Sequence, residues 1–175
     1  MPSFLQLHEE RIEPNLEGNS LAAYSVLEQA RIAIDRLADD LKDPKQAWDV
    51  SFVAAVALLR SVGHVLLNRD QVDDAVVNDF VNLHWPNWRR EPIFKELIND
   101  PRNALLKEGE LRVERHMGIS WSGPHEDPED ASDAEITGLL WSSDGSTNAL
   151  QNLERAWCWW AETLGLVYRA KNPVT

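Results

Sequence analysis

The stretch FVAAVALL, residues 52–59, decides the fold class, because every position in it is apolar. It lies in the middle of a helix that we expect to extend from about Lys45 to Asn68. A helix that is apolar nearly all round is stable in water only when other elements cover most of its surface. The stretch therefore predicts the central helix of a helical bundle.

Further helices are expected on both sides of this one, because apolar residues recur there at intervals of three and four. These amphipathic segments lie at about residues 20–43, 72–83, 92–100 and 147–172. Asn19 or Ser20 is expected to cap the first of them. In segment 72–83, the residues expected on the inner face are Val72, Val76, Phe80 and Leu83.

The last helix contains three tryptophans around the single cysteine, Cys158. Trp157 and Trp160 fall on its inner face, and Trp159 falls on the opposite side, where an exposed ring would suggest a protein interface. One cysteine cannot form an intrachain disulfide, and we expect Cys158 to be a buried structural thiol.

The helical period is lost between Leu111 and Trp141. Residues 111–121 and 135–141 partly alternate between apolar and polar, which predicts a small β-hairpin. Residues 124–133 between them are acidic without lysine or arginine, which is typical of a solvated loop. The fold class is therefore all-α: one domain, 1–175, with an extended arm at 1–18, four to five helices in a bundle, and an irregular or hairpin insertion at 111–145.

The net charge of −12 argues against a broad electrostatic contact with nucleic acid, because duplex affinity comes largely from lysine and arginine. Any polyanion would have to be held by one concentrated positive spot. The longest apolar run is far shorter than the roughly 20 residues that cross a bilayer, so we expect a cytoplasmic protein without membrane contact. The five histidines lack ligand spacing and no glycine-rich phosphate loop is present, so no metal or cofactor is expected.

A polar ribbon, Arg60, His64 and Asn68, recurs every four residues on the central helix and so falls on one face. Two interpretations are open. The ribbon either reaches solvent near the helix end, which is the usual position of charged side chains, or faces a cleft.

The stretch from His84 to Arg90 places tryptophans beside arginines. Trp88 and Arg89 could form a base-stacking and phosphate-binding patch for single-stranded nucleic acid. Alternatively, the tryptophans close the end of the bundle and the arginines pair with a neighbour such as Glu91.

The segment from Pro92 to Gly109 is interrupted by Pro101, whose ring and missing amide should kink the helix or make it restart. In the restart, Asn99 or Asp100 would cap a new helix with Arg102 in its first turn. Free amides and the helix dipole there would favour an anion, and an arginine would add a bidentate fork for phosphate.

Asn103 and Lys107 are four residues apart, so they lie on one face of this helix. The segment Arg102-Asn103-Ala104-Leu105-Leu106-Lys107 resembles the Arg-Asn-x-x-x-His signature of the HEPN superfamily, the higher eukaryotes and prokaryotes nucleotide-binding helical domain. It is also similar to a group of bacterial helical proteins that read approximately Arg-Asn-x-x-Leu-Lys-Glu.

The HEPN resemblance implies an up-and-down bundle, frequently dimeric. Many members are metal-independent ribonucleases in toxin–antitoxin and phage-defence systems. The signature places Arg102, Asn103 and Lys107 in the catalytic positions. Lys107 departs from the family histidine, and an ordinary lysine is a poor general base at neutral pH, so His64 is the candidate for the missing imidazole.

Two functions from different classes follow from these observations. In the first, Arg102, Asn103, Lys107 and His64 form a site, with Arg60, Trp88 and Arg89 as binding residues, that takes RNA or a nucleotide phosphate. In the second, the chain is a non-catalytic interaction module that uses its acidic surface and exposed tryptophans to hold a protein partner or to form a homodimer. The two are compatible, because a dimer could bring two Arg102 sites together.

Overall fold

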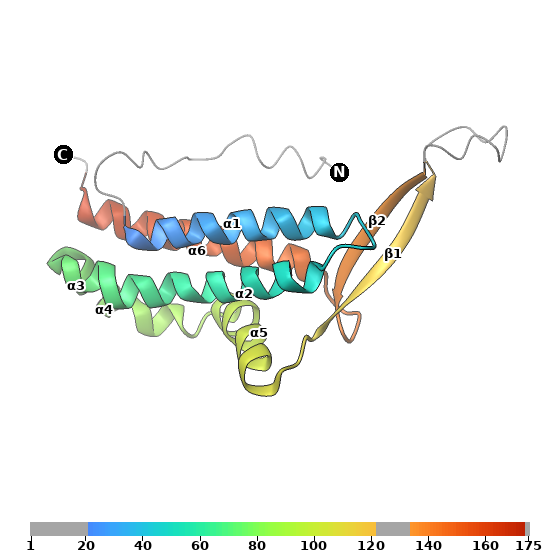
Figure 1. Ribbon diagram of the computed structural model, residues 1–175. Helices are drawn as coiled ribbons and strands as arrows, with labels where there is room; N and C mark the ends of the chain where they lie inside the picture. Colours follow the sequence, from blue (N-terminus) through green and yellow to red (C-terminus); the bar gives the residue numbers. More distant parts are fainter. Residues whose placement is uncertain (1–20, 122–133, 174–175) are drawn as a thin grey trace.

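The computed structural model describes residues 21–121 and 134–173, so the expected arm and acidic loop lie outside the described residues. Helices α1, α2, α4 and α6 form a bundle, and a ribbon of strands β1 and β2 projects from one end of it (Figure 1). The labelled elements are α1 (Ala22–Asp40), α2 (Trp48–Val65), α3 (Gln71–Asp73), α4 (Ala75–Trp88), α5 (Asp100–Asn103), β1 (Val113–Trp121), β2 (Ala134–Ser142) and α6 (Ala149–Lys171). The all-α class with a small hairpin before the last helix is confirmed.

The core lies where α1, α2 and α6 meet. Ala55, Leu59 and Val62 of α2 are fully buried, although Val53 reaches the surface. The apolar stripes of α1 and α6 close the core around them with Leu27, Ile34, Leu37, Leu153, Trp160, Leu164 and Val167. Residues 52–59 therefore lie in a core helix, but Val53 and Ala57 are exposed, so other elements do not cover this helix on all sides.

One helical stretch of the described residues, Trp48–Asp73, is long and apolar enough to cross a membrane, with a mean hydropathy of 1.9. The core helix of a soluble protein passes the same test. This stretch includes α2, which packs between α1 and α6, so a soluble protein fits the structure. A cytoplasmic location stays a prediction.

The third helix differs from its sequence prediction in start, face and end. The chain continues from α2 through a π-helical segment, Leu66–Asp70, and α3, and α4 begins only after Asp74. Val72, Val76 and Leu83, expected inside, are exposed, and the buried residues are Val77, Val81 and Trp88. The prediction was wrong because two apolar faces compete on this helix, and packing against α6 selected the one that carries Trp88. The helix also continues past Pro86, although this proline has no amide to donate to the carbonyl of Asn82.

The segment from Pro92 to Gly109 stays helical through Pro101, so the expected restart was wrong. π-helical hydrogen bonding extends over Ile93–Asn99 and over Ala104–Glu108, with α5 between them. Neither Asn99 nor Asp100 caps a new helix, and the Ala104 amide donates to carbonyls of Asp100 and Pro101. The wider π-helical turns on both sides of α5 let the helix continue through Pro101. Because no new helix starts there, the segment does not offer the free first-turn amides that were expected to bind an anion. Gly109 ends the helix in the left-handed conformation, with φ at 67°.

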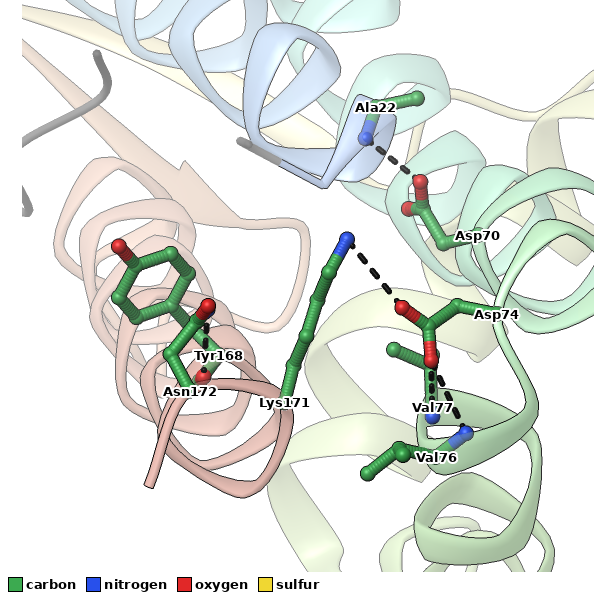
Figure 2. A network of polar contacts seen from close by, with 8 residues as sticks. All are labelled: Ala22, Asp70, Asp74, Val76, Val77, Tyr168, Lys171 and Asn172. Atoms are coloured by element: carbon green, nitrogen blue, oxygen red, sulfur yellow. Dashed lines mark hydrogen bonds and ion pairs between the residues drawn. The ribbon is translucent and has the colours of Figure 1, made fainter. Parts of the chain in front are cut away.

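The start of α1 is capped from a distant part of the chain. The carboxylate of Asp70 accepts hydrogen bonds from the backbone amides of Ala22 at 2.6 Å and Ala23 at 2.9 Å (Figure 2). The residues that the sequence predicts as caps, Asn19 and Ser20, lie outside the described residues. A carboxylate at a helix start satisfies free amides and interacts well with the helix dipole.

A second aspartate in the same network caps α4. Asp74 accepts hydrogen bonds from the amides of Val76 and Val77, and Lys171 of α6 lies 3.3 Å from its carboxylate (Figure 2). Asp70 and Asp74 thus join the ends of α1, α2, α4 and α6 at one end of the bundle.

The last helix presents a different tryptophan to the core than its sequence pattern suggests. Trp159 is buried, and its indole Nε1 donates a hydrogen bond to Glu91 at 2.6 Å. Trp157 is half-buried, and its Nε1 donates to the carbonyl of Leu27. Cys158, expected to be buried, is exposed. Phe94 packs against Trp159, so the buried face of α6 is wider here than the single amphipathic stripe that the sequence predicts.

The β-ribbon is held against the bundle at Gly138. Its strands pair antiparallel, with Met117 opposite Gly138, and a β-carbon on Gly138 would lie 1.8 Å from the carbonyl oxygen of Leu41. Only glycine lets β2 approach the end of α1 this closely. Leu140, two residues further, is fully buried beside the helices.

A Gly138→Ala substitution is therefore expected to detach the ribbon while the bundle stays folded. The overpacked contact should cost about 1–3 kcal/mol, and a two-stranded ribbon is marginally stable without its support. Hydrogen exchange should show loss of amide protection at Trp141, whose amide faces β1, with protection in α2 unchanged. The matched control is Leu139→Ala, at an exposed neighbouring position. Unchanged protection in the glycine variant would contradict this account of the junction.

Candidate functional site

A hollow of about 290 Å³ lies beside α2 and is rich in cationic side chains. Three elements form it: α2 with its π-helical continuation, the end of α4, and the π-helical segment Ile93–Asn99. We call it the arginine hollow, and its lining residues are Arg60, Leu67, Trp85, Arg89, Phe94, Lys95 and Asn99.

Arg60 is at the centre of the electrostatics of this hollow. Its guanidinium carbon lies 5.7 Å from the centroid of the Phe94 ring, a cation–π contact that holds the group beside the helix. Its Nε is buried and has no hydrogen-bond partner among the described residues. Burial lowers the pKa of Arg60, and the charges of Arg102 and Arg89 lower it further. An arginine keeps its charge despite such a shift, so three cations gather here.

The cations around the hollow are not neutralised by the rest of the described structure. Neither Arg60, Arg89, Lys95 nor Arg102 forms an ion pair with a described carboxylate, whereas ion pairs are found at other arginines and lysines of the described chain. Glu91, the expected partner of the arginines, binds Trp159 instead. Like charges held together without a counter-charge favour an anion.

The Arg-Asn pair of the HEPN-like segment lies next to this cluster. The charge of Arg102 helps to lower the pKa of Arg60, and the Nη1 of Arg102 donates a hydrogen bond to Asn103 Oδ1 at 3.1 Å. This hydrogen bond therefore helps to orient the guanidinium group of Arg102. Lys107 is exposed further along the helix and is not among the residues that line the hollow.

His64 lies in a different place from the arginines. It lines a second hollow, of about 620 Å³, with Asn68, Arg69 and residues of α1. The Asn68 amide nitrogen lies 2.8 Å from the His64 carbonyl oxygen and 3.1 Å from His64 Nδ1. Because an amide NH₂ only donates, Nδ1 accepts and the ring proton is assigned to Nε2. The expected ribbon therefore divides, with Arg60 at one hollow and His64 at the other.

The tryptophan that serves the hollow is Trp85, since Trp88 is buried in the core. The Trp88 ring packs against His84 and Phe80. Because this ring is buried, the prediction that Trp88 stacks on a nucleic-acid base was wrong. Trp85 is half-buried and meets Phe94 edge to face at a centroid distance of 5.6 Å. The alternative, that tryptophans close the end of the bundle, thus holds for Trp88, while Arg89 lines the hollow.

Four lining residues were not found from the sequence: Leu67, Phe94, Lys95 and Asn99. Lys95 and Asn99 are four residues apart in a helix that also carries Arg102, and that spacing was a usable signal. Their proximity to Arg60 depends on how the helix packs against α2. Among the described residues, no group of three histidine, cysteine or acidic side chains is placed to bind a metal ion.

Comparisons with family models, with curated proteins and with solved structures gave no match.

Proposed function

We propose that this chain is a HEPN-like helical domain that binds a phosphate group of RNA or of a nucleotide at the arginine hollow. The observation that carries the proposal is the convergence of Arg60, Arg89 and Lys95 on one hollow, with Arg102 beside them and no described carboxylate paired to any of the four. Arginine forks match phosphate oxygens bidentately. On a protein with a net charge of −12, this is the concentrated positive spot that a polyanion would need.

The geometry supports binding in preference to cleavage. General acid–base catalysis needs a titrating group within hydrogen-bond reach of the reacting atoms, directly or through one water. The described residues that line the arginine hollow include no histidine and no carboxylate, and His64 lines the other hollow. The proposed role is therefore that of a phosphate-binding module, with Asn103 positioning Arg102.

The competing function, an interaction module, loses part of its basis. Trp159, its expected exposed aromatic, is buried and bonded to Glu91. The acidic stretch 124–133 lies outside the described residues. Homodimerisation and a protein partner stay predictions from the sequence.

An Arg60→Ala variant is expected to bind a short single-stranded RNA or ATP roughly tenfold more weakly than the wild type. The factor corresponds to the loss of a charge-assisted hydrogen bond to the phosphate. Fluorescence anisotropy and calorimetry at low salt would measure the two dissociation constants, and affinity should fall as salt is raised.

The matched control is Arg36→Ala, which removes the same charge from an exposed side chain of α1. It should leave the affinity within about twofold of the wild type. Equal affinities for wild type and Arg60→Ala, or absence of binding to either ligand, would refute the proposed function.

A further inference from the structure

The second hollow, which His64 lines, has the size and lining of a site for an extended peptide. It lies between the start of α1 and the end of α2 with its π-helical continuation. Its volume of about 620 Å³ is within the range of roughly 300–1,000 Å³ that ligand sites have. Val26 and Val65 are half-buried and supply an apolar wall, and Asn68 and Arg69 are exposed and supply polar groups. A lining of this kind suits a peptide that has both apolar and charged side chains.

The polar groups of this hollow are open to a further partner. Arg69 forms no ion pair with any carboxylate in the described part of the chain. The carboxylate next to it in the sequence, that of Asp70, accepts the first amides of α1 instead. The amide nitrogen of Asn68 lies against His64, which leaves Asn68 Oδ1 to accept a hydrogen bond from a backbone amide. The hollow therefore matches an acidic segment whose backbone amides are free to donate.

The chain enters the described structure beside this hollow. Leu21 is buried, and Ala22, the next residue, lines the hollow. Asp70 holds Ala22 in place through its backbone amide (Figure 2). Residues 1–20 precede this point and lie outside the described residues. Because an extended chain covers at most about 3.5 Å per residue, residues 12–20 span up to roughly 30 Å, which is more than the width of a hollow of this volume.

The sequence of residues 12–20, which we call the N-terminal segment, complements the hollow. It reads IEPNLEGNS, so an apolar residue followed by a glutamate occurs twice within it, the second time at Leu16-Glu17. It contains no lysine or arginine. Pro14 and Gly18 disfavour a helix, so the other backbone amides of the segment are available as donors. The segment thus offers the apolar side chain, the negative charge and the amides that the hollow requires.

The exposed apolar residues of α3 and α4 offer the same segment another surface, but the charge there is unfavourable. Val72, Val76 and Leu83 are exposed on these two helices. Asp73 and Asp79 are exposed on the same helices and would repel a segment whose only charged side chains are acidic. Neither helix contains a lysine or an arginine. Charge complementarity therefore favours the second hollow.

We propose that the second hollow is the docking site of the chain's own N-terminal segment, with Leu16 against Val26 and Val65 and with Glu17 paired to Arg69. The docked segment joins the start of α1 to the end of α2 at the surface of the bundle. This contact uses a different surface from the arginine hollow, so it goes beyond the proposed phosphate binding and does not rest on it.

Disulfide formation in the full chain tests this contact. Asn15→Cys places a thiol in the segment, Ser25→Cys places one at the hollow, and Cys158→Ser removes the natural exposed thiol. The matched pair combines Asn15→Cys with Val76→Cys on the competing apolar surface. Under a mild oxidant, we expect the pair with Ser25→Cys to close within one chain roughly tenfold faster or more, because docking holds its two thiols within bonding range.

Two further changes separate docking from the effect of a tether alone. Leu16→Asn removes the apolar anchor and should slow closure of the Ser25→Cys pair roughly tenfold, since burial of a leucine contributes at least that factor. Arg69→Glu should slow closure roughly threefold, as expected for an exposed ion pair, and Glu17→Arg should restore the rate in that variant. Circular dichroism checks that each variant keeps the helical content of the wild type.

Three results would overturn the inference. The first is equal closure of the pairs with Ser25→Cys and Val76→Cys. The second is a rate for the Ser25→Cys pair that neither Leu16→Asn nor Arg69→Glu changes, because a tether alone would then explain it. The third is disulfide-linked dimers in place of the intrachain bond, because the segment would then occupy the hollow of a second copy. None of these results depends on RNA or ATP binding, so the proposed function stands or fails separately.

Discussion

Replacing Trp160 by alanine is expected to lower the free energy of unfolding by about 3–5 kcal/mol, the usual loss for a buried tryptophan. Trp160 is fully buried in α6. Its ring lies 4.8 Å from that of Trp159 and 6.0 Å from that of Phe94, centroid to centroid. On its other side, a β-carbon on Gly63 would lie 3.0 Å from Trp160 Cη2, so α2 packs directly on the indole.

The cavity left by this substitution would open between α2, α6 and the helix that carries Phe94. Rigid helices close such a cavity only partly, which is why the loss exceeds the transfer free energy of the side chain. Urea unfolding followed by far-UV circular dichroism measures the effect without relying on tryptophan fluorescence. Leu166→Ala in the same helix is the control, and its exposed side chain should matter by less than about 1 kcal/mol. A similar loss in both variants would show that Trp160 does not hold the core together.

Replacing Asp70 by alanine is expected to lower the free energy of unfolding by about 2 kcal/mol. The substitution leaves the amides of Ala22 and Ala23 without their acceptor at the start of α1. Part of the loss is offset, because the variant no longer buries a carboxylate. Chemical unfolding near pH 7 measures the change, and hydrogen exchange should show fraying of the first turn of α1.

Asp73→Ala, three residues further and exposed, is the matched control and should change the stability by less than about 0.5 kcal/mol. If the two variants were equally stable, the cap on α1 would not be a stabilising contact. Lys171 approaches Asp74 in the same network, so Asp70→Ala should leave the ion pair of Lys171 in place (Figure 2).

The same residue gives a pH dependence of known sign. Burial raises the pKa of Asp70, although the hydrogen bonds from Ala23 and Ala22 and the charges of Arg69 and Lys171 act in the opposite direction. Between about pH 3.9, where an unfolded aspartate titrates, and the higher folded pKa, the folded state binds more protons. The contribution of Asp70 is therefore largest below pH 3.9 and falls as pH rises through the folded pKa. Chemical unfolding of the wild type and of Asp70→Asn across this window measures the effect. The free energy of unfolding of the wild type should fall with rising pH relative to that of Asp70→Asn.

The sequence of the Pro92 to Gly109 segment predicted a helix with an anion site but not the form of that helix. Arg102 and Asn103 were singled out by their resemblance to the HEPN signature, and Arg102 does lie near other cations. The continuous helical path through Pro101, with π-helical segments on both sides of α5, was not predicted, because a proline has the same local preferences whether its helix breaks or widens. As a result, the proposed anion site is lined by side chains from three elements and does not use the amides of a new helix.

The buried tryptophans show the same limit. Trp159 and Trp160 are adjacent in the sequence, and a helical period assigns them to different faces, yet both are buried. Phe94, which lies 65 residues earlier in the chain, packs against Trp159. A local sequence pattern does not predict a contact between residues so far apart.

By itself, the sequence determined the helical class, the presence of a core helix at residues 52–59 and the hairpin before the last helix. These features follow from apolar periodicity, which acts within a few turns of chain. Only the tertiary structure decided which face of α4 is buried, that Asp70 caps α1, and that Arg60 meets Arg89 and Lys95 while His64 turns to another hollow. The physical reason is that these outcomes depend on contacts between distant segments, where packing selects among faces that local propensity leaves equivalent.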